Sequence, residues 1–92
     1  MIEGLLPIGS VVLVGNSIRK VMIIGVCQKG GKENKIFDYS AVIYPEGFLD
    51  PEKLFLFNND QISKIYSYGY QDDDQFEFKK KIDVAIKQLR EN

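Results

Sequence analysis

The chain has 92 residues, of which 45% are hydrophobic and 27% are charged, and its formal net charge is -1. This composition is typical of a folded protein, and the length leaves room for a single domain, residues 1–92. The sequence has no histidine and one cysteine, Cys27, which excludes a histidine general base, histidine-dependent nucleophiles and Cys/His zinc sites. The near balance of charges argues against nucleic-acid binding, because neutralising phosphates needs a basic face.

The first residues and the cysteine bear on where the chain works. Residues 1–7 have no basic region, and every apolar run is far shorter than the ~20 residues that span a bilayer. One cysteine cannot form an internal disulfide, so the fold does not depend on an oxidising compartment. Cys27 lies in an apolar run, and we expect it to be a small buried hydrophobe. We therefore expect a cytoplasmic protein with no membrane contact.

Most of the sequence is predicted to form short strands. Segments rich in β-branched and aromatic residues alternate with turn signals, which is the pattern of an antiparallel sheet. Gly25 lies inside one segment and predicts a bulge. Asp50 before Pro51 predicts one helical turn. The predicted strands cover residues 8–14, 18–28, 36–44, 54–57 and 62–69.

The last part of the sequence changes to a helical period. Apolar residues recur every three or four positions from Phe78 to Leu89, which places them on one helix face. Asp74 and Glu77 have the spacing of a capping box. Residues 77–91 contain neither Gly nor Pro. The sequence therefore predicts an amphipathic helix over about 74–91.

Together these elements predict an α+β fold. We expect a small curled antiparallel sheet of four or five strands, over about 8–70, followed by one C-terminal amphipathic helix. An SH3-like barrel is one form that such a sheet can take. The sequence leaves open whether the helix docks on its own sheet or on another chain. Homodimerisation through an exposed strand edge also stays open.

Three short segments with charged residues resemble motifs for binding metal ions, phosphates or membranes, but each has a simpler explanation. Residues 72–74 are three aspartates that favour the positive end of a helix, and they lack the spacing of a calcium loop. Residues 30–32 read Gly-Gly-Lys without the spacing of a phosphate-binding loop. The lysines at 79–81 are typical of a solvated helix face. We predict no catalytic residue, no metal site, no cofactor and no enzymatic activity.

The aromatic residues near the end of the predicted sheet are the candidate binding site. Tyr66, Tyr68 and Tyr70 recur at every second position, so an extended strand would place them on one face. If that face is exposed, it is a docking surface for a protein partner, because tyrosine offers a large contact area at low entropic cost. In the alternative, the three rings only cover the sheet beneath the helix.

Several blocks of the sequence also carry a family resemblance. They are residues 6–13, 21–25 and 38–47 (D-Y-S-A-V-I-Y-P-E-G), with Phe57, Asn58, Ile62, Gly69 and Tyr70. In these blocks the chain resembles a family of small uncharacterised proteins of Gram-positive bacteria that occur beside LXG toxins of the type VII secretion system. The resemblance extends to about Phe76.

This resemblance implies a role but no active site. It implies a cytoplasmic accessory factor, an adaptor or chaperone that binds a secreted LXG toxin or its small helical targeting proteins before export. It supplies no catalytic or cofactor-binding residue. A second reading, an immunity protein that neutralises a toxin active in the cytoplasm, stays open beside the first.

Overall fold

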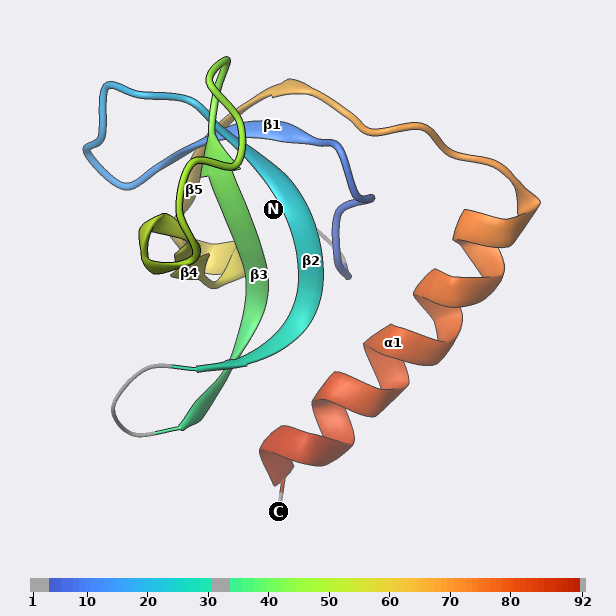
Figure 1. Ribbon diagram of the computed structural model, residues 1–92. Coiled ribbons are helices and arrows are strands. Elements are labelled where there is room, and N and C mark those ends of the chain that lie inside the picture. Colours follow the sequence, from blue (N-terminus) through green and yellow to red (C-terminus); the bar gives the residue numbers. More distant parts are fainter. Residues whose placement is uncertain (1–3, 31–33, 92) are drawn as a thin grey trace.

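Five strands form one antiparallel sheet in the spatial order β4-β3-β2-β1-β5, and one helix lies beside it (Figure 1). The computed structural model describes residues 4–30 and 34–91. The predicted α+β fold, a sheet followed by one helix, is confirmed. Our interpretations of residues 1–3 and of Gly31 and Lys32 lie outside the described residues. The elements are β1 (Val11–Val14), β2 (Val21–Gly30), β3 (Lys35–Ile43), β4 (Phe55–Phe57), β5 (Ile62–Ser67) and α1 (Asp73–Glu91).

Strands β2 and β3 form the long, bent hairpin at the centre of the sheet (Figure 1). Their register shifts between Ile23 and Gly25, so the bulge predicted at Gly25 is confirmed. A β-carbon at Gly25 would lie 2.5 Å from Ser40 Oγ. Glycine therefore allows the two strands to approach closely where the sheet bends.

Strand β1 begins at Val11, later than the strand predicted from Ile8, because a turn precedes it. Gly9 has a φ of 93°, and the Ser10 amide donates to the Pro7 carbonyl over 3.2 Å. A positive φ favours glycine, so the chain turns at Gly9 and becomes extended afterwards. β1 then pairs with both β2 and β5 and connects the two halves of the sheet.

The sheet is not closed into a barrel. Strands β4 and β5 are its two edges, and no pairing joins them within the part of the chain that the structure describes. The sheet is thus open and curled, and it does not form the SH3-like barrel considered above.

The helical turn predicted at Asp50–Pro51 is confirmed as η1 (Pro51–Lys53), where the Asp50 carboxylate accepts from the Glu52 amide over 2.9 Å.

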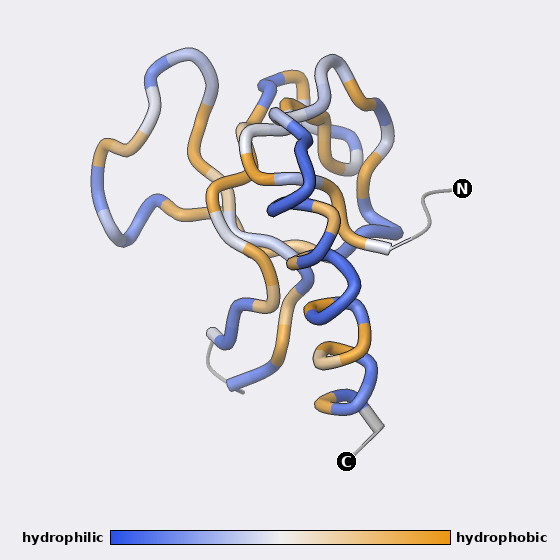
Figure 2. The backbone as a smooth tube through the Cα atoms, turned by 90° about the vertical axis from the view of Figure 1, so that its right-hand side faces the viewer, coloured by the Kyte–Doolittle hydropathy of each residue, from blue (hydrophilic) through white to orange (hydrophobic). Residues whose placement is uncertain are grey.

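Helix α1 is capped by Asp72, whereas the sequence suggested Asp74. Asp72 Oδ1 accepts from the Gln75 amide over 3.0 Å and satisfies one of the amides that a helix start leaves free. Hydrophobic and hydrophilic residues alternate along the turns of α1 (Figure 2). Ile86, on the apolar face, is 7% exposed and joins the core of the sheet. The helix therefore docks on its own sheet.

The core joins the sheet, the N-terminal segment and α1. At its centre the rings of Tyr39 and Phe57 pack with their centroids 5.4 Å apart. Leu5 and Leu6 from the N-terminal segment are buried in the same cluster. Cys27 is half-buried beside this core, so it is less enclosed than expected.

Candidate functional site

The three tyrosines predicted to form one binding face are exposed, but they do not share a strand. Strand β5 ends at Ser67, so Tyr68 and Tyr70 follow it. The exposed fractions of Tyr66, Tyr68 and Tyr70 are 43%, 59% and 81%. The rings therefore do not cover the sheet beneath the helix. Their role in binding a partner stays a prediction.

Strand β5 ends early because the chain turns toward the N-terminal segment at Gly69. The Gly69 amide donates to Ser10 Oγ over 3.0 Å, and the same hydroxyl donates to the Pro7 carbonyl over 2.7 Å. A β-carbon at Gly69 would lie 1.9 Å from the Ile8 carbonyl oxygen. This close crossing directs Tyr70 away from the strand and toward α1.

Tyr66 has a different environment from Tyr70. The ammonium groups of Lys20 and Lys64 lie 5.0 Å and 4.7 Å from the centre of the Tyr66 ring. Both distances are within the range of a cation–π interaction. Tyr66 thus belongs to a small basic patch on the edge strand.

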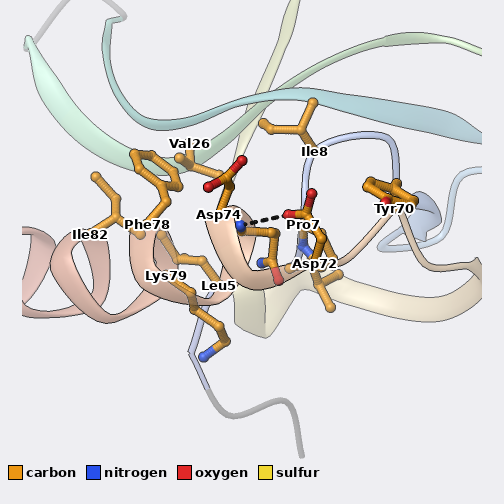
Figure 3. A pocket seen from close by; sticks show the side chains of 12 residues that line it. Leu5, Pro7, Ile8, Val26, Tyr70, Asp72, Asp74, Phe78, Lys79 and Ile82 are labelled. Atoms are coloured by element: carbon orange, nitrogen blue, oxygen red, sulfur yellow. Dashed lines mark hydrogen bonds between the residues drawn. The ribbon is translucent and has the colours of Figure 1, made fainter.

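Tyr70 borders an apolar groove between the N-terminal segment and the first half of α1 (Figure 3). The groove encloses a cavity of about 320 Å³. Phe78 and Ile82 line it from one turn of α1 to the next, and Phe78 lies next to Val26 of β2 (Figure 3). We call this site the α1 groove and define it by its lining residues. They are Leu5, Leu6, Pro7, Ile8, Val26, Tyr70, Asp72, Asp74, Gln75, Phe78, Lys79 and Ile82.

The polar side chains that line the α1 groove are Asp72, Asp74, Gln75 and Lys79. The Lys79 ammonium is engaged by Asp83, 2.8 Å away. Gln75 Oε1 is buried and has no hydrogen-bond partner among the described residues. The Asp74 carboxylate makes no hydrogen bond or ion pair in the described part of the chain, and it lies at the groove beside Asp72. The rim therefore carries negative charge.

Two hydrogen bonds fix the wall that the N-terminal segment contributes. The Leu5 amide donates to Asp83 Oδ1 over 3.0 Å, and the Leu6 amide donates to the Tyr39 hydroxyl over 2.8 Å. That hydroxyl in turn donates to Asn59 Oδ1. The wall is thus attached both to α1 and to the core of the sheet.

A second set of polar contacts fixes the far end of α1. Asp38 is buried, and one of its oxygens accepts from the Asn59 amide over 2.7 Å. Its other oxygen lies 2.9 Å from Arg90 Nη1, and Arg90 also donates to Asn58 Oδ1 over 2.8 Å. A buried carboxylate is tolerated when it is paired and hydrogen-bonded in this way. These contacts orient the whole helix and therefore the groove.

Most of the residues that carry the family resemblance make contacts that hold the helix and the sheet together. Asp38, Tyr39 and Asn58 form the polar contacts behind the helix, and Ser10 holds the crossing at Gly69. The most specific sequence blocks therefore describe the fold. Tyr70 differs, because it borders the groove and is largely exposed.

Sequence reasoning missed the groove, although it identified Tyr70. It assigned Phe78 to the core-facing stripe of the helix, yet Phe78 is 49% exposed. The stripe continues toward the start of α1 beyond the point where the sheet covers it, and the uncovered part becomes the groove wall. Gln75 gave no signal, because an amide in the first turn is typical of any helix.

Burial of Tyr39 predicts a loss of stability at high pH. Burial, with a smaller contribution from the nearby Asp38 and Asp83 charges, raises the pKa of Tyr39 to about 12 from 10.0, while the Leu6 amide opposes the shift. Below pH 10 the phenol is protonated in both the folded and the unfolded state, so Tyr39 makes its full contribution to the free energy of unfolding. Between pH 10 and about 12 only the unfolded state ionises, so the free energy of unfolding falls. Urea titrations at pH 9 and 11 test this: the wild type should lose more stability than Tyr39→Phe, and equal losses would contradict it.

A second apolar hollow of about 250 Å³ lies near edge strand β4. Leu49 and Phe55 line it, and the neighbouring Phe48 is exposed. The sequence suggested only a turn and a short strand in this region. This hollow is a smaller apolar surface on another part of the sheet.

Two further properties bear on the chemistry of the molecule. Within residues 4–30 and 34–91, no three or more Cys, His, Asp or Glu side chains are grouped so that they could hold a metal ion. Over the same residues, no helix has the length and apolar character needed to cross a membrane.

Comparison with known proteins identifies a family. Neither the curated proteins nor the solved structures include a match to the chain. A family model described as a domain of unknown function, DUF4176, matches residues 5–78. This region covers the sheet, the N-terminal wall of the groove and the first turns of α1. The chain therefore belongs to the DUF4176 family.

Proposed function

We propose that this chain is a non-catalytic protein-binding factor that acts in the cytoplasm as an adaptor or chaperone for an LXG toxin exported by type VII secretion. The observation that carries protein binding is the α1 groove, where Tyr70 is left 81% exposed beside an apolar cavity. The link to LXG toxins rests on the sequence resemblance.

The composition of the groove supports a protein partner. Ile8 and Phe78 line the same groove as Tyr70 and are each about half exposed. Scattered apolar side chains are normal on a surface, whereas adjoining ones around a hollow are typical of an interaction site. Tyrosine and phenylalanine are also enriched at the centres of interfaces, where they contribute most of the binding energy.

Deleting the gene should lower the amount of the neighbouring LXG toxin in the culture medium. The toxin carries an inactivated catalytic domain in this experiment, so that survival does not affect the result. Immunoblots of cells and medium separate failed export from toxin degradation. Complementation with the wild type should restore secretion, and Tyr70→Ser should restore it poorly. Ile18→Ser, which changes an exposed apolar side chain outside the groove, is the matched control.

Unchanged secretion and unchanged toxin stability in the deletion strain would contradict the proposal. The immunity reading predicts a different result, since expression of the chain would protect cells that produce the active toxin domain in their cytoplasm. An adaptor or chaperone that only serves export would restore secretion without giving that protection.

A further inference from the structure

We propose that the α1 groove recognises a partner segment that places an apolar side chain next to an arginine. The apolar group would fill the cavity, and the guanidinium would bind the carboxylates of Asp72 and Asp74. This inference deepens the proposed function and rests on its protein-binding part.

The cavity suits side chains better than a flat contact. An engineered apolar cavity of about 150 Å³ holds one benzene molecule. The groove, at about 320 Å³, has room for one large side chain or two smaller ones. Its walls come from Ile8, Val26, Phe78 and Ile82, so the occupant of the cavity must be apolar.

The polar rim specifies the other half of the occupant. Asp72 and Asp74 line the same cavity. Asp72 uses one oxygen to cap the helix, and Asp74 has no partner among the described residues.

Among the described residues, the cations near the groove do not neutralise these carboxylates. Lys79 is the basic residue in the lining, and its ammonium lies 2.8 Å from Asp83. The next lysine, Lys80, pairs with Glu77 over 3.4 Å. The helix start contributes about half a positive charge, which is less than the two carboxylates carry. The rim is therefore complementary to a cation.

Arginine fits this rim better than lysine. Its planar guanidinium carries five N–H donors in a fixed fork, so it can donate to two carboxylates at the same time. Hydrogen bonds from a charged donor to a carboxylate are also stronger than neutral ones.

Three synthetic peptides test the inference on the full chain labelled with ¹⁵N. Each is an amphipathic 14-mer with leucine at helical spacing. The remaining positions are all arginine in the first peptide, all glutamine in the second and all glutamate in the third. The arginine peptide should shift the amide signals around Tyr70 and Phe78 and the side-chain NH₂ signals of Gln75. The glutamate peptide should leave them unchanged.

Two variants separate the rim from general charge attraction. The double variant Asp72→Asn/Asp74→Asn keeps a helix-capping residue at position 72 and should weaken binding of the arginine peptide about tenfold. The matched control, Glu52→Gln/Asp60→Asn, makes the same change in net charge at exposed positions outside the groove and should weaken it less than twofold.

Three results would overturn the inference. They are an arginine peptide that binds no tighter than the glutamine peptide, signal shifts outside the groove, or equal weakening by the two double variants. None of these results depends on the toxin, so the inference can fail while deletion of the gene still abolishes secretion. Conversely, unchanged secretion contradicts the toxin role without affecting the peptide result.

Discussion

Replacing Gly69 by alanine is expected to lower the free energy of unfolding by about 3 kcal/mol or more, the upper range for overpacking. The added β-carbon would lie 1.9 Å from the Ile8 carbonyl oxygen and 2.7 Å from its carbonyl carbon. These are backbone atoms, and they cannot move independently. The adjacent Gly9 amide donates to the Ile23 carbonyl over 2.8 Å, so a shift of Ile8 would disturb the entry into the sheet. Urea denaturation followed by circular dichroism measures the loss.

Gly47→Ala is the matched control for this prediction. Gly47 has a φ of 83° and no atom within 4 Å of an added β-carbon. Alanine there meets only the backbone penalty of about 1–2 kcal/mol for a left-handed conformation. A Gly69→Ala variant that loses no more stability than Gly47→Ala would show that the crossing near Ile8 is not tightly packed.

The second large effect is expected from Tyr39→Phe, which should cost about 2–4 kcal/mol. The substitution keeps the ring packed on Phe57 but removes the hydroxyl, which accepts from the Leu6 amide and donates to Asn59. Leaving a buried hydrogen-bonding group unpaired costs about 1–3 kcal/mol, and two such groups lose their partner here. The same urea titration measures the change, and faster exchange of the Leu6 amide should accompany it.

Tyr66→Phe is a suitable comparison, because it removes a hydroxyl from an exposed tyrosine. Substitutions at such positions usually change stability by less than about 0.5 kcal/mol. Equal losses in the two variants would indicate that the Tyr39 hydroxyl contributes nothing specific.

Much of the fold follows from local patterns in the sequence. The β-branched runs, the glycine bulge at Gly25 and the Asp50–Pro51 turn each depend on a few neighbouring residues. The helical period after Phe76 is equally local. At the start of the helix the choice of cap was wrong, because three consecutive aspartates have the same capping preference and the tertiary structure selects Asp72.

The tyrosine face was harder to predict, because the end of β5 is set by distant residues. Ser10 and Gly69 are 59 positions apart, and their contact ends the strand at Ser67. Alternation over residues 66–70 could not reveal this. The prediction therefore identified exposed aromatic residues but placed all three on one strand, which ends at Ser67.

The α1 groove depends on contacts of still longer range. The hydrogen bond from the Leu5 amide to Asp83 joins residues 78 positions apart. The apolar stripe of α1 was visible in the sequence, but the segment that faces it was not. Whether a stripe is covered or left open follows from tertiary packing, which a periodic pattern does not contain.

The attachment of the N-terminal segment to α1 also determines the form in which the molecule can be recognised. One side of the groove comes from residues 5–8 and the other from residues 70–82, so neither stretch alone presents the surface. An array of overlapping linear peptides would retain none of it, and an isolated α1 peptide would lack the opposing wall. An antibody against the groove would accordingly bind a conformational epitope and lose it when the chain is denatured.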